Sequence, residues 1–570
     1  MAETAAEQPQ KPGWRRILAA LGSRKTGFMA IFGFAAGLPY ALLLGTLYAW
    51  LSDAQVDLET MGVFSLIGLA YAFKFLWSPA LDRIDIPLVR RLGRRKQWIV
   101  VAQLLLGVIL LVLSTLDPLK SLGWFSLLAG IGAFASATQD VVVDAWRVDV
   151  ADEEATIDIL STVYQMGYRI AALVGGALAL FLAERTSWPT VFATMGALMA
   201  LIGLASLFAP DTSRSVAHIG AEEDELAELR QPGEIEPRIR RWALLAIGIL
   251  WGWALLTVGV FMVRSLGNDP AARPDSVEFI ATRGPLVVVA TVILPAIIAA
   301  WLVYLKKAGR FVLTENEPAA AGIDRLVDHG YRALVVPLAD FVGRLGWAVI
   351  IVLGLVLTYR ITDSIWGSFA YPFYLGELEY SKDEVAVASK FFGVGALMLG
   401  LALGGTLLTV IGRMATLTFG AIIAALTNLL YADLAVGGAR MQAVSDAVGF
   451  SWLVSHLGGD ARLAKLMVTI AGENVAVGIA GAAFVAYLSS IVSKGYSAVQ
   501  YALVSSLTLL VGTLGRGALG KMIEQRGYYE VFLLTTAIGF VAVALCLVEW
   551  WRQARQAKSL PEPVSPESPG

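Results

Sequence analysis

Cysteine, histidine and charged residues are all scarce in this sequence. The single cysteine, Cys546, lies in an apolar run, which excludes a disulfide framework and a cysteine-based metal site. The three histidines, His218, His329 and His456, fall in polar segments between apolar runs, so a histidine metal centre is not expected either. The net charge of −2 identifies no partner, and no nucleic-acid surface is expected.

The low charge is accompanied by a high apolar content. Charged residues make up 16% of the 570 positions and hydrophobic residues 57%, and the mean hydropathy is +0.67. A water-soluble protein of this length, with an apolar core and a solvated surface, would not have these values. The sequence therefore predicts a polytopic membrane protein. Its apolar runs have helix length and contain many glycines, which favours a helical bundle over a barrel of short alternating strands.

Windows of about twenty apolar residues divide the chain into six spans, then two, then six. The expected spans are 28–51, 60–80, 98–116, 121–145, 159–183 and 188–209, then 242–263 and 285–305, then 345–372, 385–410, 414–432, 465–491, 497–519 and 528–551. The predicted fold class is an all-α membrane protein of about fourteen transmembrane helices, arranged as two six-helix bundles plus two extra central helices.

The predicted domains follow from this division. They are an amphipathic cytoplasmic segment 1–25, a first bundle 26–210, a linker 211–240, an inserted helix pair 241–307, a second linker 308–343, a second bundle 344–551 and a disordered cytoplasmic tail 552–570. No cleavable signal peptide is expected, because residues 1–13 are polar and the first apolar run is long enough to span. The inserted pair is expected to pack toward lipid without a functional role.

Basic residues are concentrated on one side of the early spans. They precede the first span and fill the loop after the second, whereas the loop 52–59 is acidic and has no Lys or Arg. The Lys/Arg bias therefore predicts that both termini and both linkers are cytoplasmic.

A polar stripe interrupts the apolar stretch SATQDVVVDAWRVDV, residues 136–150. Asp140, Asp144 and Arg147 are separated by four and three residues, so they share one face of a helix. Each ionisable side chain near the membrane centre costs roughly 2.5–3.5 kcal/mol on insertion scales, so the stripe needs partners, water or a cycle of protonation. Alternatively, it lies at the cytoplasmic mouth, where Arg147 pairs with Asp144 and stiffens a helix end.

Further charged and amide side chains interrupt spans of both bundles. Each alone could be structural: Arg360 and Asp363 could neutralise each other, and Lys74 could snorkel to the inner surface. Together they indicate a central hydrophilic cavity, because every one must face protein or water. The candidate substrate ligands, chosen as cations, amides and aromatics that suit an anionic sugar derivative, are Lys74, Gln139, Arg169, Arg360, Lys390, Asn474, Gln500, Tyr71 and Tyr168. The candidate proton carriers are Asp140, Asp144, Asp363 and Glu473.

A charged turn follows the second expected span. The sequence there reads SPALDR and then LGRRKQW, and a partial second copy, GGTLLTVIGRM, follows the span 385–410. Both resemble the turn motif of the major facilitator superfamily, in which ion pairs and helix-end dipoles latch neighbouring helices. Ser78-Pro79 replaces the usual glycine, and the second copy lacks the acid. The candidate gating latch is Asp82, Arg83, Arg94, Arg95, Lys96 and Arg147.

Six stretches resemble the AmpG muropeptide permease family of the major facilitator superfamily. They are FGFAAGLPYALLLGTLYAWL, FKFLWSPALDR, SATQDVVVDAWRVDV, GYRIAALVGGALALFLAE, GENVAVGIAGAAFVAYLSS and KGYSAVQYALVSSL. The resemblance covers residues 28–210 and 340–550 and leaves out the inserted pair and the polar termini. Arg360 stands where the family commonly has lysine, a departure that affects the accepted peptide or sugar.

The resemblance implies a major facilitator fold and proton-driven import of anhydro-muropeptides from periplasm to cytoplasm, for wall recycling and β-lactamase induction. The family's functional residues would correspond to Lys74, Asp82, Gln139, Asp140, Asp144, Asp149, Arg169, Asp363, Glu473, Asn474 and Gln500. Two bundles would rock about a midplane site, with the basic turn as an inner latch. The expected protein is a monomer of the bacterial inner membrane, not an enzyme, whose partners are substrate, protons and lipid, with no cofactor besides the proton gradient.

Three alternatives stay open at this point. The chain could import another bulky anion, of acyl-coenzyme A or sugar-acid type, because relatives of the family include such carriers. It could be a membrane enzyme acting on lipid-linked sugars, although its carboxylates lie inside helices with no histidine beside them. It could also be a sensor in which substrate binding only signals.

Overall fold

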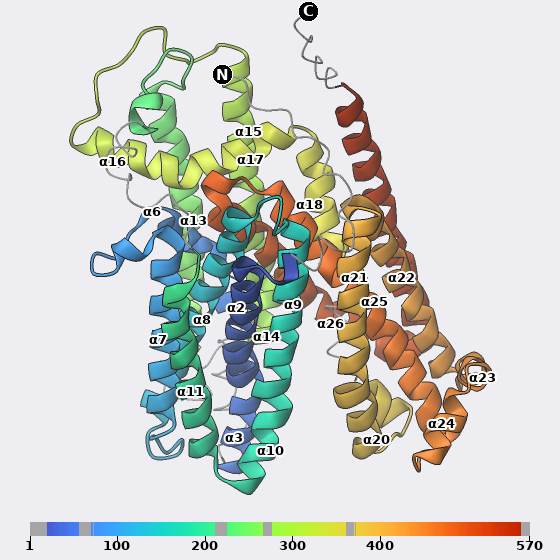
Figure 1. Cartoon of the computed structure of the whole chain (residues 1–570). Coiled ribbons are helices and arrows are strands. Elements are labelled where there is room, and N and C mark those ends of the chain that lie inside the picture. Colours follow the sequence, from blue (N-terminus) through green and yellow to red (C-terminus); the bar gives the residue numbers. More distant parts are fainter. Residues whose placement is uncertain are drawn as a thin grey trace, which may run out of the picture.

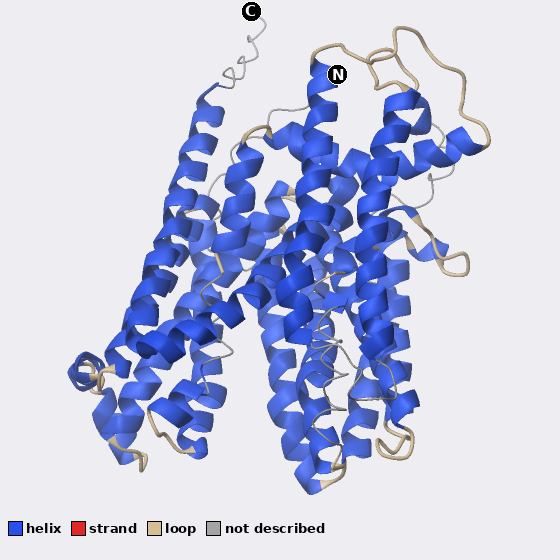
Figure 2. Cartoon of the chain, turned by 180° about the vertical axis from the view of Figure 1, so that it is seen from behind, coloured by secondary structure: helices blue, strands red, loops and turns tan. Residues whose placement is uncertain are grey.

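The computed structural model describes residues 20–55, 70–71, 73–210, 225–265, 276–360, 370 and 372–559. These residues are almost wholly helical, apart from loops and an isolated antiparallel bridge between Ile235 and Val312 (Figure 2). Ten helices in this part of the chain are long and apolar enough to cross a membrane, and an eleventh span arises if the bent pair Ile323–Leu345 and Ala348–Thr358 counts as one. The predicted all-α polytopic class is therefore confirmed.

The ten helices coincide with ten of the predicted spans. The predicted spans 28–51 and 497–519 are also helical, although they are not among the ten. The spans 60–80 and 345–372 extend beyond the described residues. The total of about fourteen transmembrane helices stays a prediction.

The first half consists of helices joined by short turns. They are α2 (Arg24–Ala41), α3 (Leu47–Asp53), α6 (Ser78–Arg83), α7 (Arg94–Leu113), α8 (Leu122–Val150), α9 (Ile157–Leu173), α10 (Ala179–Arg185) and α11 (Trp188–Ala205), with the short turns η1 (Leu42–Thr46), η2 (Lys74–Leu76) and η4 (Val174–Leu178). α2, α9 and α11 each begin at a side-chain cap. Thr156 caps α9 by accepting the Ile159 N–H (3.4 Å), and Ser187 caps α11 in the same way. α2 packs along α9, and α7 packs on both α8 and α11.

The second half has the same all-helical character. Its elements are α18 (Ala348–Thr358), η9 (Pro372–Glu377), α20 (Lys382–Ala386), η10 (Val387–Phe392), α21 (Gly393–Val410), α22 (Arg413–Ala435), α23 (Ala439–Ala447), α24 (Phe450–His456), α25 (Ala461–Ile491) and α26 (Ser497–Ser559). α25 packs on α21 and α22, and α26 packs on α18 and α22. The backbone of α26 breaks at Gly527 (φ 75°, ψ 169°), a conformation that favours glycine, so this element carries two of the predicted spans.

The inserted part lies between the halves in sequence and contacts both of them in space. Its elements are α13 (Pro237–Ser265), α14 (Ser276–Val288), η7 (Val289–Ile293), α15 (Leu294–Lys307), α16 (Ile323–Gly330), η8 (Tyr331–Val335) and α17 (Val336–Leu345). The buried Trp251 of α13 meets Phe75 of the first half edge to face, with ring centroids 6.0 Å apart, and α14 packs on α26 of the second half. The expectation that the inserted pair packs only toward lipid therefore needs correction.

The second connector contains more helix than the predicted linker. Over 308–343 the prediction was a linker, yet a helix runs from Ile323 to Leu345, and Figure 1 shows it lying across one end of the bundle. Its sequence alternates apolar and polar positions with helical spacing, which favours a helix along the surface of the bundle. The Ile235–Val312 bridge ties the first connector to the second, so both form one layer at this end.

The two halves meet at the end of the bundle that carries this layer, which we call the joined end (Figures 1 and 2). There α9 packs on α21 and α25, and α8 packs on α26. Toward the other end, the far end, the ribbons of the halves diverge, and α10 and α20 lie apart in Figure 1. The start of α2 and the end of α26 both lie at the joined end.

Glycine permits close helix packing in each half. A Cβ on Gly33 of α2 would lie 2.2 Å from the carbonyl oxygen of Tyr164 in α9, and one on Gly400 of α21 would lie 2.3 Å from that of Val475 in α25. Helices approach this closely only where no side chain intervenes. The packing of α2 on α9 fixes the position of Tyr164, which faces the candidate site.

Candidate functional site

Four charged side chains form a network inside the first half, which we call the central network. Lys74 of η2 is bonded to Asp140 of α8, its Nζ lies 3.8 Å from Asp144, and Nη2 of Arg147 lies 2.9 Å from Asp144. The three α8 residues share one helix face because of their spacing. The polar stripe thus has its partner in Lys74, and the pairing of Arg147 with Asp144 is one part of a larger set of contacts.

The members of the central network differ in exposure. The side chains of Lys74, Asp144 and Arg147 are 4%, 5% and 0% exposed, whereas that of Asp140 is 16% exposed. Buried charges are costly unless they are paired, and here two cations face two anions, so the ionised network sums to zero. Asp140 is the member that a proton or ligand can reach with the least rearrangement.

Arg147 connects the central network to the second half. Its Nε donates to Ser489 Oγ of α25 (3.1 Å), and its guanidinium lies over the rings of Tyr164 and Tyr501, 4.8 and 5.0 Å from their centroids. Ser489 and Tyr501 both belong to the second half. A change in the Arg147–Asp144 pair therefore acts directly on a contact between the halves.

Tyrosines lie next to the network. Tyr164 donates to Asp140 Oδ1 (2.8 Å), and Tyr71 donates to Ser136 Oγ (2.6 Å) one helical turn away. The ring of Tyr40 lies 5.0 Å from that of Tyr71 and 6.0 Å from that of Tyr168, centroid to centroid. The predicted ligands Tyr71 and Tyr168 therefore come together with Tyr40, which the sequence did not single out. Their apolar faces with polar edges suit a ligand that is partly apolar and partly hydroxylated.

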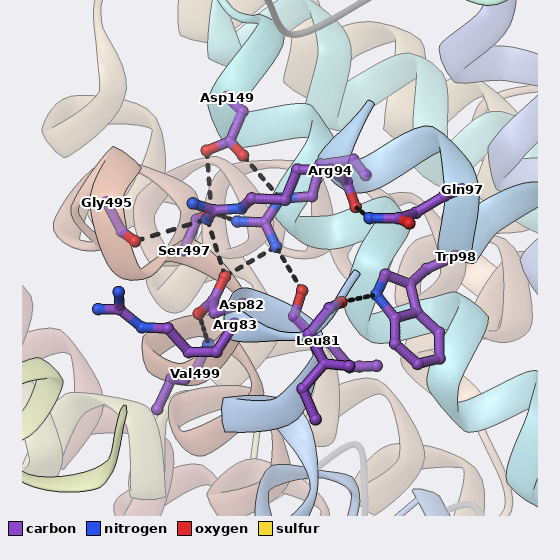
Figure 3. A network of polar contacts seen from close by, with 12 residues as sticks. Leu81, Asp82, Arg83, Arg94, Gln97, Trp98, Asp149, Gly495, Ser497 and Val499 are labelled. Carbon is purple, nitrogen blue, oxygen red and sulfur yellow. Dashed lines mark hydrogen bonds and ion pairs between the residues drawn. The ribbon is translucent and has the colours of Figure 1, made fainter. Parts of the chain in front are cut away.

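The candidate latch is an ion-pair cluster at the joined end (Figure 3). Arg94 donates to Asp82 Oδ1 (3.0 Å), Arg95 Nη1 lies 2.7 Å from the same oxygen, and Arg95 Nε donates to Asp149 Oδ2 (2.8 Å). The side chain of Arg95 is completely buried. These contacts tie α6, α7 and α8 of the first half together.

The same cluster binds the start of α26. Arg95 donates to Ser497 Oγ (2.8 Å), Ser497 donates to Asp149 Oδ1 (2.9 Å), and the Val499 N–H donates to Asp82 Oδ2 (3.0 Å). The carboxylate of Asp82 thus lies at a helix N-terminus, where the helix dipole favours negative charge. Three of the predicted latch residues therefore contact the second half or hold the residues that do, namely Asp82, Arg94 and Arg95.

The other three predicted latch residues lie elsewhere. In Figure 3 the guanidinium of Arg83 points away from the cluster, and it pairs with Glu225 of the first connector (3.1 Å) and lies 5.7 Å from the ring centroid of Tyr496. Lys96 donates to the Ala209 carbonyl (3.2 Å) within the first half. Arg147 belongs to the central network, because it pairs with Asp144 on the same face of α8.

The second copy of the turn motif forms a second tie between the halves. α22 begins at Arg413 after Gly412 (φ 88°), just as α7 begins at Arg94 after Gly93 (φ 94°). Arg413 Nε donates to Asp158 Oδ1 at the start of α9 (2.9 Å). The acid that this copy lacks in its own sequence is therefore supplied by the first half.

The connectors bind both halves at the joined end. Glu225 accepts from Arg83 of the first half and from Arg332 Nε of η8 (2.8 Å), while Arg344 of α17 donates to Gln500 Oε1 of α26 (3.0 Å). We call this set of contacts the brace. Partial burial raises the pKa of Glu225, but Arg332 and Arg83 lower it further, so the pKa lies below its usual value. At neutral pH Glu225 therefore carries the charge that the brace requires.

Gln500 lies in the brace rather than at the central network. Its amide donates to the Pro337 carbonyl (2.9 Å) and to Asp340 (2.8 Å), and its carbonyl accepts from Arg344 and from the Ser493 N–H. The resemblance gave it a functional role, and the structure shows a residue that holds α17 to α26.

The remaining predicted residues of the second half are dispersed. Glu473 accepts a hydrogen bond from Tyr431, which is bonded to Tyr374 (2.8 Å), so this acid sits among aromatic residues. The neighbouring Asn474 donates to Ile470 of its own helix (2.8 Å). Arg360 directly follows Tyr359 at the end of α18, and its Nη1 comes within 3.9 Å of the position that a Cβ on Gly481 would take. Asp363 and the side chain of Lys390 lie outside the described residues.

Two further candidates lie in the first half. Gln139 is completely buried beside Asp140, and among the described residues neither its amide nitrogen nor its oxygen has a hydrogen-bond partner. Arg169 directly follows Tyr168 on α9. Each therefore lies directly next in sequence to a residue of this site, Gln139 to Asp140 and Arg169 to Tyr168.

A family model described as Major Facilitator Superfamily matches residues 26–268. Among solved structures, the proton:xylose symporter XylE bound to 6-bromo-6-deoxy-D-glucose has a TM-score of 0.50 and 11% identity, covering 93% of this chain and 95% of that chain. A double-tryptophan variant of XylE has a TM-score of 0.51 and 13% identity, covering 91% of this chain and 94% of that chain. The described part of the chain therefore has the major facilitator fold.

The curated relatives narrow this class. The chain is 27% identical over 528 residues to the anhydromuropeptide permease of Escherichia coli strain K12, which covers 92% of this chain and 79% of the relative. It is 25% identical over 517 residues to the putative transporter AmpG 4 of Rickettsia conorii, covering 91% of this chain and 94% of the relative. Over most of its length the chain is therefore similar to proteins named as an anhydromuropeptide permease and as an AmpG-type transporter.

Proposed function

We propose that this protein is a proton-coupled permease that imports anhydro-muropeptides, sugar-linked wall peptides, from the periplasm into the cytoplasm. The observation that carries the proposal is the central network: a buried lysine and arginine facing two aspartates, linked through Arg147 to the second half. The substrate class rests on the relatives, one of which is named an anhydromuropeptide permease. Such import would serve wall recycling and β-lactamase induction.

Charge balance links a proton to an anionic substrate. With all four groups ionised the network is neutral, and protonation of Asp140 leaves one net positive charge on Lys74 and Arg147. A peptide carboxylate then binds better to the protonated network than to the ionised one. Binding free energies are reciprocal, so the bound carboxylate in turn favours the proton. Proton and substrate would therefore enter the cycle together.

The tyrosines next to Asp140 complete the proposed site. Tyr40, Tyr71 and Tyr168 would contact the sugar rings, while Lys74 and Arg169 would contact carboxylates, because a lysine is a compact cation and an arginine a planar donor fork. Release of Lys74 from protonated Asp140 would make its ammonium group available to the ligand.

The transport cycle would use the contacts between the halves. In this structure the joined end is tied by the latch cluster and by the Arg413–Asp158 pair. Inward release requires these contacts to break, while Arg147 transmits the state of Asp144 to Ser489. A two-state equilibrium biased by ligand and proton at one site is sufficient for alternating access.

The proposed orientation places the joined end in the cytoplasm of a bacterial cell and the protein in the inner membrane. The basic turn residues Arg90, Arg91, Arg94 and Arg95 lie at this end, and cytoplasmic loops carry an excess of such residues. Because the start of α2 and the end of α26 also lie there, both termini would be cytoplasmic.

The test is uptake of radiolabelled anhydro-muropeptide into proteoliposomes with and without an inward proton gradient. Wild type is compared with Asp140→Asn, Arg169→Ala and a control, Asp117→Asn, whose exposed carboxylate lies in the loop between α7 and α8. We expect gradient-dependent accumulation in wild type and in the control, and its loss in both site variants.

Two outcomes would overturn parts of the proposal. Accumulation in Asp140→Asn that still follows the proton gradient would remove Asp140 from the coupling step. Failure of wild type to accumulate the label, together with gradient-driven uptake of a different bulky anion, would exclude anhydro-muropeptide as the substrate.

A further inference from the structure

Two short helices join α22 to α25 at the far end of the second half. The connection comprises α23 (Ala439–Ala447) and α24 (Phe450–His456), and we call it the hairpin. Figure 1 shows it at the outer edge of the bundle, beyond the ends of α22 and α25. Both flanking helices are long and apolar enough to cross a membrane, so the hairpin begins and ends where two spans leave the bilayer.

The hairpin exposes its apolar side chains. Val448, Trp452 and Leu457 are 70%, 65% and 80% exposed, and Val444 and Leu453 are also exposed. A connection of this length in water normally turns such side chains inward, because exposed apolar area is costly. Here a large apolar surface faces outward from the protein.

Some polar side chains of the hairpin are turned inward, while Arg440, Asp446, Ser455 and His456 are exposed. Ser445 is completely buried and is hydrogen-bonded to Ser451 (2.8 Å), and Gln442 donates to Ser451 (3.1 Å). Asp433 of α22 accepts the Met441 N–H (2.9 Å) and so fixes the start of α23. These hydrogen bonds hold the two helices in one arrangement, so the outward apolar face is a fixed feature.

The apolar face continues a stripe on the neighbouring span. Phe419, Leu426, Leu429 and Val436 of α22 and its end are all exposed, and their spacings of seven, three and seven residues place them on one side of a helix. On a membrane-crossing helix such a stripe faces lipid. The stripe leads directly into Val444 and Val448 of the hairpin.

We propose that the hairpin lies in the membrane interface at the far end, with Val448 and Trp452 inserted among the lipids. Lipid covers the apolar face of the hairpin, because this face follows the lipid-facing stripe of α22 and lies at the level where α22 and α25 end. An exposed tryptophan in this position matches the preference of this side chain for the boundary between headgroups and acyl chains. The hairpin thus anchors the far end of the second half to the membrane surface while the halves move.

The experiment measures the depth of nitroxide labels in the full-length protein. Cys546→Ser removes the single native cysteine, and Val448→Cys and Trp452→Cys are labelled one at a time after reconstitution in phosphatidylethanolamine and phosphatidylglycerol vesicles. Relaxation by oxygen, which enters the bilayer, is compared with relaxation by a water-soluble nickel chelate. Two references calibrate the scale: Leu426→Cys on the lipid-facing stripe, and Lys120→Cys in an exposed loop at the same end.

Both hairpin labels are expected about 5–10 Å inside the headgroup boundary, between the two references. Labels that match Lys120→Cys, with the nickel chelate as the stronger relaxant, would show a water-exposed hairpin and overturn the proposal. Labels shielded from both relaxants would show that protein, a second copy or another partner, covers the face, and would overturn it as well. Two label positions keep the test valid if one substitution disturbs folding, and no step depends on the transported substrate.

Discussion

Asp82→Asn is expected to favour opening of the joined end. Asp82 accepts the Val499 N–H across the boundary between the halves (3.0 Å). Its ion pairs with Arg94 and Arg95 lie within the first half, so they persist when the halves separate. They therefore do not contribute to the free-energy difference between the closed and open arrangements. Among the contacts of Asp82, only the hydrogen bond to the start of α26 crosses between the halves. Neutralising the carboxylate weakens that contact and leaves the fold of the first half intact.

The size of the effect follows from this one contact. A hydrogen bond to a charged group contributes about 1.5–3 kcal/mol. Losing that amount lowers the ratio of closed to open protein by roughly 10- to 150-fold, because each 1.4 kcal/mol is about a factor of ten. A minor open population in wild type would therefore become a readily measured fraction in the variant.

Distances between two spin labels report this balance directly. In the Cys546→Ser background, labels at Leu88→Cys and Ile411→Cys, both exposed at the joined end, span the two halves. Asp82→Asn should add a longer distance component. Asp85→Asn is the matched control, because Asp85 is bonded to Gln97 within the first half and should leave the distances unchanged. Identical distance distributions for wild type and Asp82→Asn would refute the assignment of this contact as a tie between the halves.

Three further predictions concern the brace, the central network and helix packing. Glu225→Gln should speed tryptic cleavage of the connectors, because the brace is stabilised only while the Glu225 carboxylate is ionised. The cleavage rate of wild type should approach that of the variant as pH falls through the lowered pKa of Glu225. Lys74→Met should destabilise the protein by about 3–5 kcal/mol by removing the cation that pairs with Asp140, and adding Asp140→Asn should restore part of the thermal stability in detergent; no recovery would contradict direct pairing. Gly33→Val should lower the melting temperature through a clash costing about 1–3 kcal/mol, whereas Gly27→Val, whose Cβ would meet nothing within 4 Å, should not.

The parts of the site that the sequence predicted are those set by local spacing. Asp140, Asp144 and Arg147 share a face because an α-helix repeats every 3.6 residues, and no tertiary information is needed for that inference. The acid and arginines of the turn motif likewise lie within fourteen residues of one another, from Asp82 to Arg95. Local patterns of this kind survive into the folded protein when the helix itself forms.

Partners from the other half were beyond the reach of the sequence. Ser489 and Ser497 are ordinary residues of apolar helices, and only the packing of α25 and α26 on α8 brings them to Arg147 and Arg95. Asp158 did carry a signal, as the first acid of a span, but such an acid is equally explained as a favourable charge at a helix N-terminus. Gln500 was selected as an amide within an apolar span, and its contacts with Pro337 and Asp340 of α17 depend on how α17 packs on α26.

The two turn motifs tie the halves at separate places, one at the start of α26 and the other at the start of α9. Because these two contacts lie at separate places, the halves cannot separate at the joined end while either contact is intact. Opening therefore requires both contacts to break. The free energies of the two contacts then add to the barrier that opposes opening, and half-open forms are disfavoured. Loss of the Asp82 tie would raise the open population, and the Arg413–Asp158 pair would still oppose opening.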